Sequence, residues 1–97
     1  MEISTKSESS TVSIVSLNGA LNARSAEDAK QTFRDLSDEG VEKVIVNLKD
    51  VPFIDSSGLA ALVSGLKTLN EKEGSLKLAS LQSQADLLFR LTMFDKV

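Results

Sequence analysis

The sequence predicts a single α/β domain, a mixed four-stranded sheet covered by helices, with elements in the order β-β-α-β-α-β-α. Two features of the pattern lead to this prediction. Short runs of β-branched and apolar residues alternate with longer segments whose apolar residues recur at helical spacing. Clusters of small and polar residues separate the two kinds of segment. A chain of 97 residues has room for one hydrophobic core, so we expect one domain over residues 1–97.

The first half of the chain is predicted to form two strands and a helix. Residues 3–7 alternate weakly and indicate an edge strand, and residues 11–17 are rich in β-branched residues and indicate a second strand. Ser25 and Asp28 weakly match the capping-box pattern of a helix start. Gly40 is suited to the position just after the helix end. Between them, apolar residues recur at helical spacing: Ala26, Ala29, Phe33 and Leu36.

The second half is predicted to contain two further strands and two further helices. Residues 41–48 carry a continuous apolar centre, which indicates a parallel strand buried on both faces. Residues 75–81 read as another strand, and Ser83 is expected to cap a last helix. Because strand-helix-strand crossovers are right-handed, we expect the last three strands to be parallel. Gly74 is expected to end a helix whose core stripe is Leu59, Leu62, Val63, Leu66 and Leu69.

The rest of the chain is organised around residues 51–59. Pro52 cannot donate to a strand ladder, so it indicates a strand end or a loop. Asp55, Ser56 and Ser57 are all good N-cap residues, so we expect a helix to begin at Asp55 or Ser56. Unpaired N–H groups and the helix dipole would favour a phosphate on such a serine. The simpler interpretation is a cluster of capping residues with no further function.

Composition excludes several classes of function. The net charge of −3 and a sequence pI of about 4.8 argue against a nucleic-acid surface, and Trp and Tyr are absent. Without Cys or His, the chain cannot form a Ser-His-Asp or Cys-His catalytic site or the usual zinc sites. We therefore predict no catalytic residues, no metal and no cofactor. No apolar run has the ~20 residues of a membrane helix, and the N-terminus lacks a signal-peptide core, so we expect a cytoplasmic protein without membrane insertion.

The run Ile54-Asp55-Ser56-Ser57-Gly58-Leu59 resembles the signature of bacterial anti-sigma factor antagonists, the STAS domain family. Residues 19–26, 44–48 and 91–97 resemble further segments of that family in the same order, so the similarity covers essentially the whole chain. The Asp-Ser-Ser-Gly-Leu word alone is moderately specific, and its context makes it strong.

The resemblance implies a phosphorylation-controlled protein-binding switch. It maps the phosphorylated residue to Ser56, with Ser57 as the alternative acceptor. The expected kinase is the anti-sigma factor itself, a GHKL-fold ATPase, which the unphosphorylated antagonist binds so that the sigma factor is released. A PP2C-type phosphatase resets the switch. The expected partner-binding residues are Asn22, Asp55, Ser56, Ser57, Gly58 and Leu59.

Some features depart from the family pattern. Asn22 stands where the family usually has Asp, so it is either a partner contact or simply a turn or cap residue. Met93 and Phe94 replace commoner small or aliphatic residues. Many relatives continue past this point with a short strand and helix, so the resemblance implies either a truncated domain or a native end at Val97. We expect a monomer or a weak dimer.

Two other functions compete with this prediction. A STAS domain can serve as a regulatory or scaffold subunit of a lipid-transport ABC complex or of a stressosome, in which Ser56 need not turn over. A small nucleotide hydrolase is the enzymatic alternative, but the chain has no Gly-rich phosphate loop with Lys.

Among the expected partner-binding residues, Gly58 has no side chain, so we expect a partner surface to approach closely there.

Overall fold

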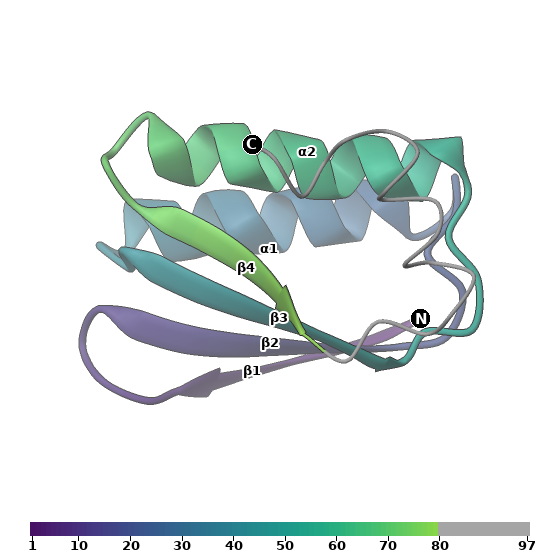
Figure 1. The fold of residues 1–97 in the computed structure, drawn as a ribbon, viewed down its shortest axis with the longest axis horizontal. Coiled ribbons are helices and arrows are strands. Elements are labelled where there is room, and N and C mark those ends of the chain that lie inside the picture. The colour runs from purple at the N-terminus through teal and green to yellow at the C-terminus, as the bar shows by residue number, and fades with distance from the viewer. Residues whose placement is uncertain (80–97) are drawn as a thin grey trace.

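The computed structural model describes residues 1–79 as two helices packed on a four-stranded sheet (Figure 1). The observed order, β-β-α-β-α-β, agrees with the predicted order. The predicted end of the last strand, the helix from Ser83 and the segment at 91–97 lie outside the described residues. The elements are β1 (Glu2–Ser7), β2 (Val12–Asn18), α1 (Ala26–Asp38), β3 (Lys43–Asp50), α2 (Ser56–Asn70) and β4 (Ser75–Ala79).

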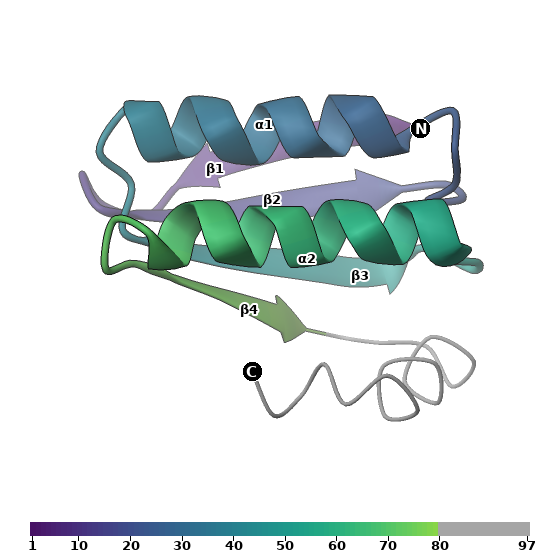
Figure 2. The same ribbon diagram turned by 90° about the horizontal axis from the view of Figure 1, so that it is seen from above.

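The strands follow one another across the sheet in the order β1-β2-β3-β4. β1 and β2 form an antiparallel hairpin. The last three strands, β2, β3 and β4, are parallel, as predicted. Since the strands of the parallel part point the same way, their carboxyl ends meet at one end of the sheet. The N-termini of α1 and α2 lie at that same end (Figure 2).

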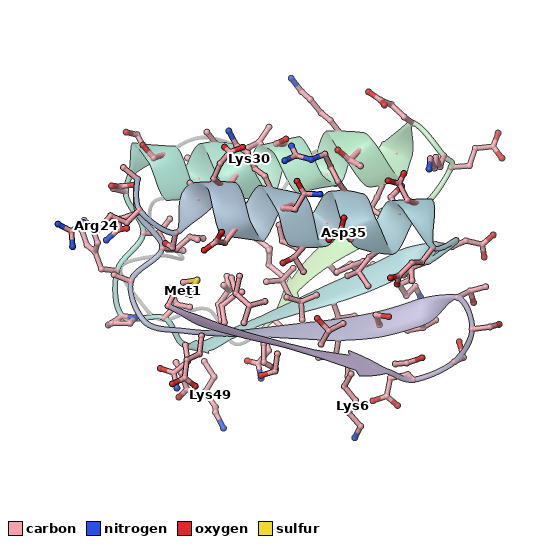
Figure 3. The ribbon with its side chains drawn as sticks, turned by 180° about the vertical axis from the view of Figure 1, so that it is seen from behind. Met1, Lys6, Arg24, Lys30, Asp35 and Lys49 are labelled. Atoms are coloured by element: carbon pink, nitrogen blue, oxygen red, sulfur yellow. The ribbon has the colours of Figure 1, made fainter. Side chains whose placement is uncertain are left out.

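Both helices cover the same face of the sheet (Figures 1 and 2). Side chains from this face of β3 are fully buried beneath them, whereas Ile45 and Asn47 on the opposite face are half-buried. The expectation that this strand is buried on both faces was therefore wrong. Figure 3 shows Lys6 and Lys49 projecting from the sheet on the side away from the helices. The largest fully buried side chains are Phe33, Leu17, Leu21, Leu48, Leu62, Leu69, Val15, Val44, Val46 and Val51.

The two helices end differently. Gly40 has a φ of 90° just after α1, and the N–H groups of Gly40 and Val41 donate to the carbonyls of Ser37 and Leu36. This is the glycine-terminated helix end that the sequence predicts. After α2 the left-handed residue is Glu73, with a φ of 60°, and not Gly74. Glycine at 74 instead avoids a clash, because a Cβ there would meet the carbonyl oxygen of Glu42.

The buried stripe of α2 is narrower than predicted. Leu62, Leu66 and Leu69 are buried, but Leu59 and Val63 are only half-buried. Glycine and alanine complete the buried side of the helix, and Gly65 lies against Phe33 of α1. No helix of residues 1–79 combines the length and hydropathy needed for a transmembrane span.

Candidate functional site

Helix α2 begins where the sequence predicts. Asp55 is the N-cap, with an extended backbone, and Ser56 is the first helical residue. The Asp55 carboxylate accepts a hydrogen bond from the N–H of Gly58 at 2.9 Å. This bond satisfies one of the donors that every helix start leaves unpaired. The Asp55 side chain therefore caps the first turn of the helix.

The two candidate serines differ in exposure. Ser56 is exposed, and within residues 1–79 its hydroxyl has no hydrogen-bond partner. Ser57 is half-buried. An enzyme can therefore reach the Ser56 hydroxyl more easily than its neighbour.

The start of α2 leaves unpaired backbone donors at Ser56 and Ser57. The first backbone hydrogen bond of the helix runs from the N–H of Leu59 to the carbonyl of Asp55, at 2.9 Å. Among the described residues, no backbone carbonyl accepts from the N–H of Ser56 or of Ser57. These two free donors and the positive end of the helix dipole can stabilise an anion attached to the serine.

A backbone bridge joins this helix start to the turn that contains Asn22. Leu21 and Ile54 form an isolated parallel bridge. The N–H of Leu21 donates to Phe53 at 2.9 Å, and its carbonyl accepts from the N–H of Asp55 at 3.1 Å. The structure therefore brings together two stretches that lie about thirty residues apart and that both carry predicted site residues.

Asn22 shapes its own turn. Its side-chain oxygen accepts from the N–H of Arg24 at 3.0 Å, which is the Asx-turn geometry of a loop residue. Ser25 is the residue before α1, but its hydroxyl does not cap that helix as the capping-box match predicts. It donates to the carbonyl of Ala20 at 2.9 Å and accepts from the N–H of Asn22 at 3.0 Å. Ser25 thus fixes the turn beside the helix start.

Gly58 lies beneath the site and not on its surface. It is buried, and a Cβ at this position would clash with the carbonyl group of Leu21. Its missing side chain therefore allows contact within the chain, whereas we expected it to admit a partner. Leu59, the next residue, is half-buried and packs partly against the core.

An open groove of about 450 Å³ runs along α2 from Ser56. Its lining is a mixture of small, apolar and polar side chains, with one cation at the far end. The lining residues are Ser56, Leu59, Ala60, Val63, Ser64 and Lys67. The groove is contiguous with the candidate acceptor. It is an open surface feature and not an enclosed pocket suited to a small cofactor.

The structure adds one residue that the sequence reasoning missed. Phe53 lies in the loop before α2, three positions from Ser56, and the residue is 53% exposed. The neighbouring Ile54 is buried, as expected for an apolar residue. The sequence signal was an aromatic residue directly after Pro52, at a point where the strand has to end.

Residues 1–79 contain no group of three or more acidic, His or Cys side chains placed to bind a metal ion. The charged residue closest to the serines in sequence is Asp55, and its carboxylate is bonded to the helix start. These side chains can present a hydroxyl and hold an anion, but they do not form an acid–base pair for catalysis.

Comparison with known proteins identifies the family. The STAS domain family model matches residues 4–97. The anti-sigma-B factor antagonist of Staphylococcus epidermidis is 30% identical over 78 residues, which are 80% of this chain and 72% of that protein.

Solved structures agree with this result. A crystal structure from Thermotoga maritima, described as a candidate anti-sigma factor antagonist, is 28% identical, with a TM-score of 0.90 over 98% of this chain and 81% of that one. SpoIIAA from Bacillus in its phosphorylated form shares the fold at 17% identity, with a TM-score of 0.79 over 94% and 83% of the two chains. The chain belongs to the STAS domain family, whose members include anti-sigma factor antagonists.

Proposed function

We propose that this protein is an anti-sigma factor antagonist whose binding to an anti-sigma factor kinase is controlled by phosphorylation of Ser56. Unphosphorylated, it binds the kinase and the sigma factor is released. The observation that carries this proposal is the exposed Ser56 hydroxyl at the first residue of α2, with no partner among residues 1–79.

The family supports the proposal in two ways. Relatives of similar length are named anti-sigma-B factor antagonists. One structural neighbour, SpoIIAA, has been solved in both an unphosphorylated and a phosphorylated form. By analogy, the protein contributes no catalysis, and a GHKL-type kinase supplies the nucleotide, the metal and the catalytic groups. A PP2C-type phosphatase removes the phosphate, and the exchange takes place in the cytoplasm.

The local electrostatics suit a switch of this kind. Phosphorylation adds up to about two negative charges and three acceptor oxygens. In the free domain, the start of α2 stabilises that charge by about 1 kcal/mol. In a complex, the same phosphate must be desolvated beside the Asp55 carboxylate. A loss of about 3 kcal/mol in binding free energy weakens association more than a hundredfold, so the switch needs no refolding.

Ser56 is the better acceptor of the two serines. Ser57 is half-buried, whereas Ser56 is exposed, so a kinase can reach Ser56 with less rearrangement of the helix start. Modification at Ser57 is the alternative, and site mapping distinguishes the two.

The first experiment is intact mass and site mapping after incubation with ATP and candidate GHKL kinases from the same genome. We expect one added phosphate, on Ser56, in the wild type and in Ser57→Ala, and none in Ser56→Ala. Phosphate on Ser57 would contradict the assignment of Ser56 and make Ser57 the phosphorylated residue. No phosphate with any of these kinases would contradict the proposal.

The second experiment measures the affinity of the kinase for variants of the chain. We expect Ser56→Asp to bind at least tenfold more weakly than Ser56→Ala, since even a carboxylate carries part of the phosphate's charge. Ser10→Asp is the matched control, because Ser10 is exposed in the β1–β2 turn, at the opposite end of the sheet (Figure 1). Equal affinity of Ser56→Asp and Ser56→Ala would rule out charge exclusion as the mechanism.

A further inference from the structure

We propose that Phe53 is the docking anchor through which the kinase holds this protein while it acts on Ser56. This inference rests on the proposed function and names a contact for it. Large exposed hydrophobic side chains among residues 1–79 are limited to Met1, at 43% exposed, and Phe53, at 53%. An aromatic ring left in water costs free energy that a partner surface can recover by covering it.

The backbone that carries this ring is held in place. On one side of it, the buried Ile54 holds the chain in the core. The backbone of Leu21 pairs with the carbonyl of Phe53 and with the N–H of Asp55. Because the backbone is held at both points, little backbone conformational entropy remains to be lost when the ring is bound.

A cation lies on the turn next to this loop. Arg24 is exposed, and no carboxylate of residues 1–79 forms an ion pair with it. Figure 3 shows its side chain extending outward at the end of the molecule that carries the starts of both helices. Aromatic residues and arginine are the types most enriched among residues that dominate binding energy. The partner surface should therefore be an apolar pocket bordered by a carboxylate.

Such an anchor contributes to kinase affinity independently of the phosphorylation state of Ser56. Burial of the Phe53 ring involves no polar group, and Phe53 lies three residues from Ser56, whereas the phosphate adds charge and acceptor oxygens beside Asp55. Loss of the ring should therefore weaken the encounter with the kinase without slowing phosphate transfer. In kinetic terms KM rises while kcat is unchanged, the pattern of an interaction made equally in the ground and transition states.

The experiment compares Phe53→Ala with wild type, using the full 97-residue chain and the kinase that phosphorylates Ser56. We expect Kd and KM to rise by about tenfold or more, with kcat unchanged. Phe53→Leu should fall between the two, and Arg24→Ala should weaken binding a few-fold. Ile14→Ala is the apolar control, because Ile14 is half-buried on the far face of the sheet, and its binding should equal that of wild type.

Several outcomes would overturn the anchor. If Phe53→Ala binds and is phosphorylated like wild type, the ring has no role in docking. If it lowers the thermal midpoint as much as removing a core side chain does, Phe53 belongs to the fold instead. Either result leaves Ser56 phosphorylation of the wild-type protein intact. Failure of every kinase to modify wild type would remove both the proposed function and the anchor that rests on it.

Discussion

Gly58 in the first turn of α2 lies directly against the carbonyl group of Leu21. A Cβ at position 58 would come closer to that oxygen than real Cβ contacts allow. The same carbonyl accepts the N–H of Asp55, so it is held in place by the loop that leads into the helix. The glycine of the Asp-Ser-Ser-Gly word therefore has a structural reason, which is close packing of the helix start on the neighbouring turn.

We predict that Gly58→Ala destabilises the protein. Alanine gains about 1 kcal/mol in helix propensity, but overpacking against a backbone group costs more than that. The expected net loss is about 1–3 kcal/mol in the free energy of unfolding, measured by urea denaturation. Ser56→Ala, in the same turn but exposed, should stay within about 0.5 kcal/mol of wild type. Equal stability of the two variants would show that the helix start can move away.

Contact between α1 and α2 depends on a second glycine. A Cβ on Gly65 would meet the ring of Phe33, which is fully buried. We predict that Gly65→Ala lowers stability by about 1–2 kcal/mol, since the ring or the helices must shift. Combining it with Phe33→Leu should cost less than the sum of the two single variants, because the smaller side chain leaves room for the added methyl group. Strict additivity in urea denaturation would contradict direct contact.

The order of elements and the start of α2 were predictable from local signals. Apolar periodicity separates strands from helices, and Asp55 followed by Ser56 is a strong helix start. These signals come from neighbours in the chain, so they need no knowledge of the tertiary structure. The end of α1 at Gly40 was predictable for the same reason.

Other features depend on contacts between distant segments. The bridge between Leu21 and Ile54 joins two loops, and no local pattern predicts it. Exposure of Phe53 follows from which way the loop turns after Pro52. An apolar run such as that of β3 does not tell whether helices cover one face of the sheet or both. The sequence also cannot show that Glu73, and not Gly74, adopts the left-handed conformation.

Placement of both helices on one face predicts unequal costs along β3. Leu48→Ala should cost about 2–5 kcal/mol, because Leu48 is fully buried beneath the helices. Ile45→Ala should cost only about 1 kcal/mol, since Ile45 is half-buried on the other face, beside Ile14 and Lys77. Chemical denaturation measures both. Similar losses for the two variants would mean that the far face is also covered.

Ser25 should prove to be a turn residue and not a helix cap. Ser25 is buried, with 5% of the residue exposed, and its hydroxyl links the carbonyl of Ala20 to the N–H of Asn22. We predict that Ser25→Ala costs about 1–3 kcal/mol, because both backbone groups lose their partner. Ser25→Asp should not restore stability, although Asp is an excellent N-cap, since a carboxylate cannot donate to a carbonyl. Full stability of Ser25→Asp in thermal denaturation would favour the capping role.

The last prediction concerns a polar group buried without a partner. Ser37, in the last turn of α1, is 2% exposed, and its hydroxyl has no hydrogen-bond partner among the described residues. Burial of a hydroxyl that makes no hydrogen bond costs desolvation free energy that nothing offsets. Alanine is also a better helix former than serine. We therefore expect Ser37→Ala to raise the free energy of unfolding by about 0.5–2 kcal/mol. Ser37→Val should not, because a branched side chain adds volume to a packed site. A loss of stability in Ser37→Ala would show that the hydroxyl makes a hydrogen bond in solution.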